Sequence, residues 1–363
     1  MNKRWNIYIS TLALGFIFPI TSISSNLNGF KQKVVFQYWK VDSKQKTVNW
    51  FRQNSFPIFV QYALIDDIMI SASRSMAIMK SNDQTLRGLG DTKIKFSYQS
   101  PTGYFRTSAG VSLPIGKNIL ESGEIDLANK LYHEIFEVDV ARLGQGLNVE
   151  GSLIGAATFQ SILLSVGMNY RSTGSYRIIK NTFSYNPGDQ IQFLLGSQID
   201  RDWITNQNTL IYRNYSVDKI GGTKSFEQGS ELEWYSSLMI SILKTQIDFF
   251  LDHRWREPGP PVTESSFQMG NTSRNSRKLG FELLYPMTPT LAISAGFSNY
   301  YIAGDNKSGR GRSTVQQISI GSHFQITDYT KLKLEGRFSK GQMENDTLKL
   351  AGQTYLAVLQ ASI

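Results

Sequence analysis

The chain has 363 residues, of which 18% are charged and 12% are aromatic, and its formal net charge is +9. The absence of cysteine excludes a disulfide framework and a lipoprotein anchor. Downstream of the N-terminal segment, no stretch reaches the about 20 apolar residues that a membrane-spanning helix needs, which excludes a polytopic helical membrane protein. The charged fraction lies below the usual value of about 25%, and together with the many aromatic residues it favours a β-barrel over two soluble domains.

The N-terminal segment has the three parts of a secretory signal peptide. Met1 to Arg4 carries positive charge, residues 7–20 are mostly apolar, and residues 21–25 offer small side chains for cleavage. We therefore predict a signal peptide over residues 1–24, followed by a single domain over residues 25–363.

Alternating apolar and polar residues identify the predicted strands, because neighbouring side chains in a strand point to opposite faces. The first predicted strands cover residues 33–41, 55–64 and 68–73. Polar connections are expected over residues 42–54 and 80–90. The N-terminal part of the domain therefore combines short turns with longer loops.

The most regular hairpin lies between residues 88 and 116. Ile94, Phe96 and Tyr98 share one face of its first strand, opposite a polar face. After a Pro-Gly turn, the second strand alternates in the same way over residues 105–113. Both strands of this hairpin therefore have one apolar face and one polar face.

Two long stretches interrupt the alternation. Residues 114–144 are irregular, and a connection of this length is usually functional. We expect this segment to carry a helical piece over residues 125–136 and to fold inward or cover the mouth of the barrel. A second long surface loop is expected over residues 200–229, apart from a short alternating run at residues 210–215.

The remaining alternating segments complete the predicted sheet. A weak strand is expected over residues 175–185, followed by a short turn at residues 186–189. The clearer strands cover residues 147–153, 162–170, 191–199, 232–240, 247–254, 279–285, 291–297, 315–324, 329–338 and 355–363. Short turns alternate with longer loops, as in outer-membrane barrels whose short turns face the periplasm. The sequence therefore predicts an all-β, antiparallel, up-and-down transmembrane β-barrel of about 16 strands, with about 12 to 16 compatible with the pattern.

Charged residues on the polar faces distinguish a membrane barrel from a soluble sandwich. In a barrel the apolar face meets lipid and the inner face meets water, so the inner face can carry full charges. Such residues either tune the passage of solutes or fill the lumen with salt bridges. The predicted lumen-lining residues are Lys93, Lys95, Arg106, Glu150, Glu231, Glu233, Asp248, Asp252, Arg254, Lys331, Lys333, Glu335 and Arg337.

The central hairpin also carries a family-like motif within GLGDTKIKFSYQSPTGYFRTSAGVSLPIGK. This stretch resembles the early part of a family of outer-membrane channels named for the MetA pathway of phenol degradation. The residues that carry the resemblance are Gly88, Gly90, Asp91, Leu113, Pro114 and Gly116. The resemblance implies an outer-membrane barrel that takes up small hydrophobic or aromatic molecules.

Enzymatic chemistry finds little support in the sequence. His133, His253 and His323 are far apart and lack the spacing of metal ligands. No nucleophile motif accompanies them, so we predict neither enzymatic activity nor a bound cofactor or metal. The basic residues are scattered along the chain, which argues against nucleic acid as a partner.

These patterns predict a porin-like channel or transporter for a small solute in the outer membrane of a Gram-negative bacterium. The expected partners are the barrel assembly machinery, outer-membrane lipid and lipopolysaccharide, and a solute of unknown identity. The alternative is a surface-exposed structural or adhesin-like barrel, whose long loops at residues 114–144 and 200–229 bind a partner. Channel conductance in a planar bilayer distinguishes the two functions.

Overall fold

The computed structural model describes most of the chain after the N-terminal segment. The described residues are 29–43, 48–82, 84–131, 134–140, 143–180, 182–258, 274–304, 311–343, 345 and 347–362. The predicted signal peptide over residues 1–24 and the side chain of His133 lie outside the described residues.

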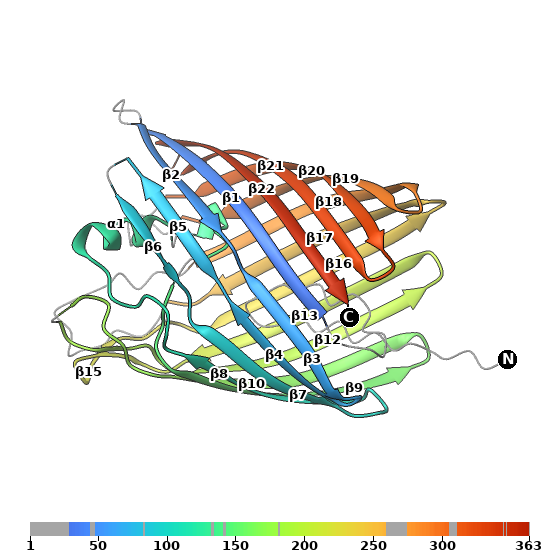
Figure 1. The fold of residues 1–363 in the computed structure, drawn as a ribbon, viewed down its shortest axis with the longest axis horizontal. Helices are drawn as coiled ribbons and strands as arrows, with labels where there is room; N and C mark the ends of the chain where they lie inside the picture. Colours follow the sequence, from blue (N-terminus) through green and yellow to red (C-terminus); the bar gives the residue numbers. More distant parts are fainter. Residues whose placement is uncertain are drawn as a thin grey trace.

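The described residues form a closed antiparallel β-barrel of 16 strands, as the sequence predicts (Figure 1). The first strand, β1 (Gly29–Ser43), pairs with the last strand, β22 (Leu348–Ser362), along its whole length. This pairing satisfies the backbone groups at both edges of the sheet, which is what a sheet needs in order to cross a membrane.

Three strands of the barrel are each built from two shorter pieces: β2 (Val48–Ser55) with β3 (Ile58–Ile65), β4 (Ile68–Arg74) with β5 (Met76–Ser81), and β6 (Thr85–Leu89) with β7 (Thr92–Gln99). The other barrel strands are β8 (Phe105–Leu113), β9 (Asn148–Phe159), β10 (Ile162–Thr173), β12 (Gln190–Arg201), β13 (Ile204–Tyr215), β16 (Glu231–Ile242), β17 (Thr245–Arg256), β18 (Arg274–Thr288), β19 (Leu291–Ile302), β20 (Ser313–Thr327) and β21 (Thr330–Met343).

The two ends of the barrel differ. At the end that holds the C-terminus (Figure 1), short turns join neighbouring strands, for example at Asp66–Asp67, Asp202–Trp203 and Asp328–Tyr329. The other end carries the α-helix α1 (Ser122–Leu131), the 3-10 helix η1 (Glu134–Phe136) and a small sheet of β11 (Tyr185–Asn186), β14 (Asp218–Ile220) and β15 (Thr223–Phe226). We call these the turn end and the loop end. No described helix is long and apolar enough to cross a membrane.

The two faces of the wall carry different side chains. On the outer face, the exposed fractions of Val166, Leu195 and Ile320 are 62%, 58% and 61%. On the inner face, polar residues such as Gln192 and Ser294 are buried. Large apolar side chains exposed on strands that alternate with polar ones are typical of a wall between lipid and an inner space that holds polar groups.

Several sequence-based boundaries were wrong. Residues 175–185 do not form a barrel strand, and residues 186–189 belong to the loop end rather than to a short turn. Within the loop expected over residues 200–229, residues 204–215 form the barrel strand β13, whereas residues 216–229 lie at the loop end and include β14 and β15. The polar connection expected over residues 42–54 contains most of β2, and the one over residues 80–90 contains β6 and the end of β5.

The physical reason is similar for β13, β5 and β6: polar residues interrupt their outer faces. On the outer face of β13, Asn206 and Asn208 stand between Ile204 and Leu210, which hides the alternation. On β5 and β6, Lys80 and Arg87 lie beyond the apolar part of the wall, where a strand no longer needs an apolar face.

Candidate functional site

The candidate site is built around the segment between β8 and β9, residues 114–147, which we call the inner segment. It contains α1 and η1, so the helical piece predicted over residues 125–136 is present with different boundaries. Leu127 and Ile135 are 0% and 1% exposed. The segment therefore folds inward, as its length suggested, and packs against the inner face of the wall.

Aromatic packing anchors the inner segment to β1 and β2. The ring of Phe136 lies 5.3 Å from that of Trp39 and 4.6 Å from that of Phe51, both edge-on. All three rings are almost completely buried. Edge-to-face aromatic pairs contribute about 0.5 to 1.5 kcal/mol beyond the burial of their area, so this contact holds the segment firmly against the wall.

Two glutamine side chains on the same wall bind the backbone of the inner segment. Gln37 Nε2 donates to Glu137 O at 3.1 Å, and Gln37 Oε1 accepts from Asp139 N at 3.0 Å. Gln53 Nε2 donates to Val140 O at 2.7 Å, and Gln53 Oε1 accepts from Val140 N at 3.0 Å. Each amide thus pairs with both a donor and an acceptor, which satisfies backbone groups that the segment cannot pair by itself.

Charged contacts complete the attachment on both sides of the lumen. On the β1 side, Lys33 Nζ forms an ion pair with Asp139. On the far side, Lys278 Nζ of β18 lies 2.6 Å from Glu137 Oε1. The inner segment is therefore fixed to β1 and β2 at one side and to β18 at the other, so that it crosses part of the lumen.

The family-like motif joins the wall to both ends of the inner segment. Asp91 Oδ1 accepts from Gly116 N at 2.9 Å, and Asp91 Oδ2 accepts from Gln145 N at 2.7 Å. A Cβ atom at Gly116 would lie 2.7 Å from Asp91 N, so only glycine allows this approach. One carboxylate therefore holds the beginning and the end of the inner segment together.

The other motif residues surround this carboxylate. Gly90 N donates to Ser75 O at 2.7 Å, and a Cβ at Gly90 would lie 2.5 Å from Ser75 Oγ. The remaining members lie at the end of β6, at the end of β8 and directly after it: Gly88, Leu113 and Pro114.

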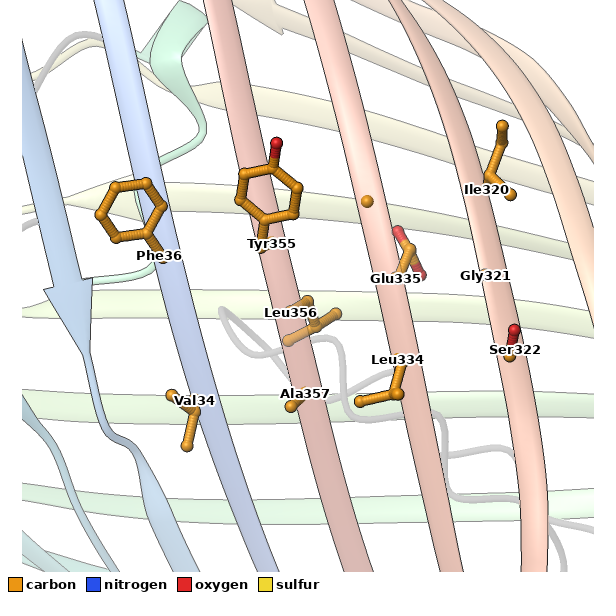
Figure 2. Close-up of a pocket in the computed structure, with 11 residues that line it drawn as sticks. Val34, Phe36, Ile320, Gly321, Ser322, Leu334, Glu335, Tyr355, Leu356 and Ala357 are labelled. Carbon is orange, nitrogen blue, oxygen red and sulfur yellow. The ribbon is translucent and has the colours of Figure 1, made fainter.

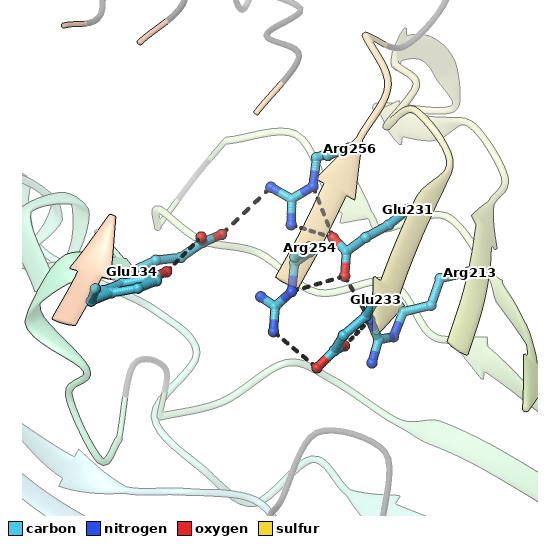
Figure 3. Close-up of polar contacts among 7 residues, drawn as sticks. Glu134, Arg213, Glu231, Glu233, Arg254 and Arg256 are labelled. Carbon is cyan, nitrogen blue, oxygen red and sulfur yellow. Dashed lines mark hydrogen bonds and ion pairs between the residues drawn. The ribbon is translucent and has the colours of Figure 1, made fainter. Parts of the chain in front are cut away.

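Figure 3 shows a cluster of charged side chains at the loop end of β13, β16 and β17. Glu231 lies at its centre and its side chain is 3% exposed. The nearest guanidinium nitrogens of Arg213, Arg254 and Arg256 lie 2.6, 3.4 and 2.5 Å from its carboxylate oxygens. These contacts fix three arginine side chains inside the barrel.

The cluster also reaches the inner segment and a second glutamate. Arg256 Nη1 lies 3.5 Å from Glu134 Oε1 of η1, and Tyr300 Oη donates to Glu134 Oε2 at 3.4 Å. Glu233 Oε1 lies 3.4 Å from Arg254 Nη2. Three arginines and three glutamates therefore balance in formal charge, and the cluster supports the inner segment rather than offering a single strong charge.

A basic group lies on the inner face of β7, β8 and β10. Its members are four side chains that point to the same face of the sheet as the buried side chain of Ser97: Lys93, Lys95, Arg106 and Arg171. Glu150 of β9 is the acidic member of this wall. Gly110 of β8 is paired with Lys95 on one side and with Glu150 on the other, so Glu150 and Lys95 point to the same face. The wall has more positive than negative groups.

An acidic group lies on β17 and β18, on the opposite side of the barrel (Figure 1). Asp248 is paired directly with Glu282, and like charges in this position destabilise a sheet. Asp252 has the same parity as Asp248 on β17. Among the described residues, Asp248 Oδ1 is buried without a hydrogen-bond partner. An arrangement that costs stability in this way favours a functional explanation.

The last predicted lumen residues lie on β21, which β19 and β20 separate from β18. Lys333 Nζ lies 2.7 Å from Glu335 Oε2 and 3.8 Å from Glu282 Oε1, and Arg337 also forms an ion pair with Glu335. Lys331 shares their parity and is exposed near the turn end. The side chains of all predicted lumen residues therefore point to the inner face of the wall. Their role in passage stays a prediction.

Sequence reasoning missed several members of the site: Lys33, Gln37, Gln53, Glu134, Glu137, Asp139, Arg213, Arg256 and Lys278. Arg256 continues the alternation of β17, and Arg213 lies in the short run at residues 210–215, so a longer reading of those patterns could have found both. Glu134, Glu137 and Asp139 lie in an irregular segment, where no periodicity marks a face. Among the described residues, no group of three or more histidine, aspartate or glutamate side chains could hold a metal ion.

Comparisons with known proteins support the fold. No family model and no curated protein matches this chain. A bacterial polysaccharide outer-membrane secretin matches with a TM-score of 0.51 and 10% identity, over 94% of this chain and 100% of that chain. An anion-selective porin from Comamonas acidovorans matches with a TM-score of 0.43 and 11% identity, over 92% of this chain and 98% of that chain. OccK7 (OpdD) from Pseudomonas aeruginosa matches with a TM-score of 0.43 and 9% identity, over 92% and 98%.

At these identities the similarity shows the fold alone. The closed 16-strand wall defines the class of the protein as a porin-like outer-membrane β-barrel. The resemblance to the phenol-degradation channels is not tested by a matching family model and stays a prediction.

Proposed function

We propose that this protein is an outer-membrane channel for small solutes, in which the inner segment narrows the lumen. The observation that carries the proposal is the inner segment itself, fixed to β1 and β2 on one side and to β18 on the other, beside the basic group on β7, β8 and β10 and the acidic pair Asp248 and Glu282. A barrel that serves only as a surface scaffold has no need of a segment held across its lumen, or of a buried carboxylate oxygen without a hydrogen-bond partner among the described residues, such as Asp248 Oδ1.

The proposal includes the location and the partners. The protein is exported by the signal peptide, inserted by the barrel assembly machinery and surrounded by outer-membrane lipid and lipopolysaccharide. The solute passes without chemical change, so neither catalysis nor a cofactor is part of the proposal. The adhesin-like alternative loses support, because one of its two contact loops packs against the inner face of the wall and residues 204–215 of the other form β13.

The charged walls suggest the class of solute. Basic side chains on β7, β8 and β10 face the acidic pair Asp248 and Glu282 of β17 and β18, and charged groups that line a pore set its preference among solutes. The family resemblance implies small hydrophobic or aromatic molecules. A small aromatic molecule that also carries a charged or polar group satisfies both observations, and we propose this class.

The test is the conductance of the refolded mature protein in a planar bilayer, together with solute-driven swelling of proteoliposomes. Stepwise conductance and faster swelling with small aromatic acids than with large oligosaccharides would support the proposal. A correctly folded protein without conductance or uptake, by contrast, would contradict it and restore the surface-scaffold alternative.

Charge reversal at Lys95 is expected to change ion preference. Lys95→Glu replaces a positive by a negative charge and so changes the charge of the basic wall by two units. Each unit about 4 Å from a passing ion is worth about 1 kcal/mol in water, so the relative permeability should shift toward cations by about thirtyfold. Reversal potentials across a salt gradient measure the shift. Asp252→Lys on the acidic wall should shift the potential the other way, and Lys219→Glu on the exposed strand β14 should leave it unchanged. Equal shifts for Lys95→Glu and Lys219→Glu would mean that Lys95 does not line the path.

A further inference from the structure

The outer wall of the barrel carries a row of basic residues at its loop end. Alternation along each strand gives their direction: Trp39, Phe51 and Leu350 point inward and are buried, so the neighbouring Lys40, Arg52 and Lys349 point outward. On the next two strands, Ala77 and Met79 of β5 and Leu86 of β6 are buried in the same way, which places Lys80 and Arg87 on the outer face.

The strand pairing brings these cations together. Arg52 of β2 lies directly across from Lys80 of β5, and Lys349 of β22 lies directly across from Asp42 of β1. Arg87 of β6 lies across from Ile78, which precedes Lys80 by two positions. The row therefore extends over five neighbouring strands: β6, β5, β2, β1 and β22.

The cations also share one depth in the membrane. Strands of such barrels tilt by about 45°. The depth in the membrane therefore changes by about 2.3 Å for each residue along a strand, and by about 3.4 Å from a residue to its partner on the next strand. Figure 1 shows β2, β5 and β6 displaced toward the loop end relative to β1, and β22 displaced toward the turn end. With the registers given above, the five cations lie within about 4 Å of one depth.

Most of the row has no carboxylate partner in the part of the chain that the structure describes. Lys40 Nζ lies 3.0 Å from Asp42 Oδ2. Arg52, Lys80, Arg87 and Lys349 form no ion pair with a described residue, and Arg87 and Lys349 are exposed. The row therefore has a clear excess of positive charge that faces outward.

An apolar groove lies on the outer face of the wall, nearer the turn end than the row of cations (Figure 2). Phe36, Tyr355 and Leu334 line it (Figure 2). Gly336 of β21, which has no side chain, is a further lining residue. The exposed fractions of Tyr355 and Leu334 are 46% and 42%. By the same estimate of tilt, the groove lies about 10 to 20 Å nearer the turn end than Lys40.

We propose that the cation row and this groove form one binding site for a phosphate-bearing, acylated lipid of the outer leaflet. The phosphates contact the cations, and an acyl chain lies in the groove over Gly336. A free phosphate or a soluble polyanion would use the cations and leave the groove unused, whereas a neutral lipid would use the groove and leave the cations unused. An anionic lipid uses both at the separation that the wall provides.

This inference goes beyond the proposed channel and rests only on its location in the outer membrane. Binding of bis-phosphorylated lipid A to the refolded mature protein in detergent, measured by native mass spectrometry, provides the test. Lipid A without its phosphates and inorganic phosphate alone are the two comparison ligands. Tight binding only of the phosphorylated lipid is expected. Equal binding of the dephosphorylated lipid, or binding of inorganic phosphate with the same affinity, would overturn the proposal.

Matched variants test the part that the cations play in lipid binding. Arg52→Gln/Lys80→Gln/Lys349→Gln should weaken binding on the order of a hundredfold, because each of the three surface cations near an anionic lipid contributes about fivefold. The control Lys219→Gln/Lys224→Gln/Arg277→Gln removes the same charge from exposed positions elsewhere and should leave affinity within about twofold. An equal loss of affinity in the control would mean that the net charge of the protein determines binding, and would contradict a defined site.

The groove is examined by filling it. A Cβ at Gly336 meets no atom closer than 3.8 Å, and a Cβ at Gly155, on the outer face of β9, meets none within 4 Å. Gly336→Phe should therefore fold and weaken lipid binding roughly tenfold, the value of about two methylene groups, whereas Gly155→Phe should not. Unchanged binding in Gly336→Phe would exclude the groove from the site. Conductance recorded on the same samples tests the proposed channel separately, since the outer wall is not part of the path.

Discussion

Asp91→Ala is expected to release the inner segment from the wall and to raise the conductance of the channel. The Asp91 carboxylate accepts hydrogen bonds from Gly116 N and Gln145 N, at the two ends of the segment. Hydrogen bonds to a charged group contribute about 1.5 to 3 kcal/mol each, so the pair is worth about 3 to 6 kcal/mol. Loss of both leaves the aromatic and amide contacts to β1 and β2 as the main attachment.

Single-channel recording and limited proteolysis measure this release. Larger and noisier conductance steps are expected, together with new cleavage within residues 114–147 while the barrel stays resistant. Asp66→Ala, at an exposed short turn, removes a carboxylate that does not contact the segment and should behave as the wild type. Asp91→Asn keeps the size of the side chain and should give a smaller change in the same direction. Conductance and cleavage unchanged in Asp91→Ala would mean that this carboxylate does not hold the segment.

The role of Asp91 shows where reasoning from the sequence stops. The motif around it was visible as a family resemblance, and the barrel class followed from alternation and from the absence of long apolar helices. The contacts of Asp91, however, reach residues 25 and 54 positions away. Such contacts are set by how the inner segment folds back, and no local periodicity encodes that path.

The predicted strand count was confirmed, although one of its members was wrong. The weak strand at residues 175–185 is absent from the barrel, and β13 takes its place. Two-residue alternation is a signal of different environments on the two faces, so it fails where the outer face is polar, as at Asn206 and Asn208. It also fails at the loop-end edge of the apolar wall, where Lys80 and Arg87 face outward.

The amide contacts of the inner segment were beyond prediction for another reason. Gln37 and Gln53 occupy ordinary inner positions on β1 and β2, where any polar residue fits the pattern. Only the structure shows that both pair with backbone groups at residues 137–140. Conversely, the side chain of every lumen residue that the alternation selected points to the inner face. The face that a side chain occupies depends only on its position along its own strand, so a local pattern predicts it.

Glu231→Ala is expected to cause the largest loss of stability among single changes in the lumen. Its carboxylate is 3% exposed and lies beside Arg213, Arg254 and Arg256. Removing one partner of a buried ion pair costs about 3 to 5 kcal/mol, because the remaining charge is left uncompensated. Here three guanidinium groups lose their common partner, and Arg256 also loses a contact that orients it toward Glu134 of the inner segment.

Denaturant unfolding of the refolded protein, followed by the heat-dependent shift in gel mobility, measures the effect. Glu231→Ala should unfold at a clearly lower denaturant concentration than the wild type, and its channel should favour anions, since the lumen gains a net positive charge. Glu257→Ala removes the same type of side chain at an exposed position and should leave both properties unchanged. Because Glu233 is more exposed, at 13%, Glu233→Ala should have a smaller effect on unfolding. If Glu231→Ala and Glu257→Ala unfold together with the wild type, the cluster does not stabilise the barrel, and its charges are then available to act on the solute.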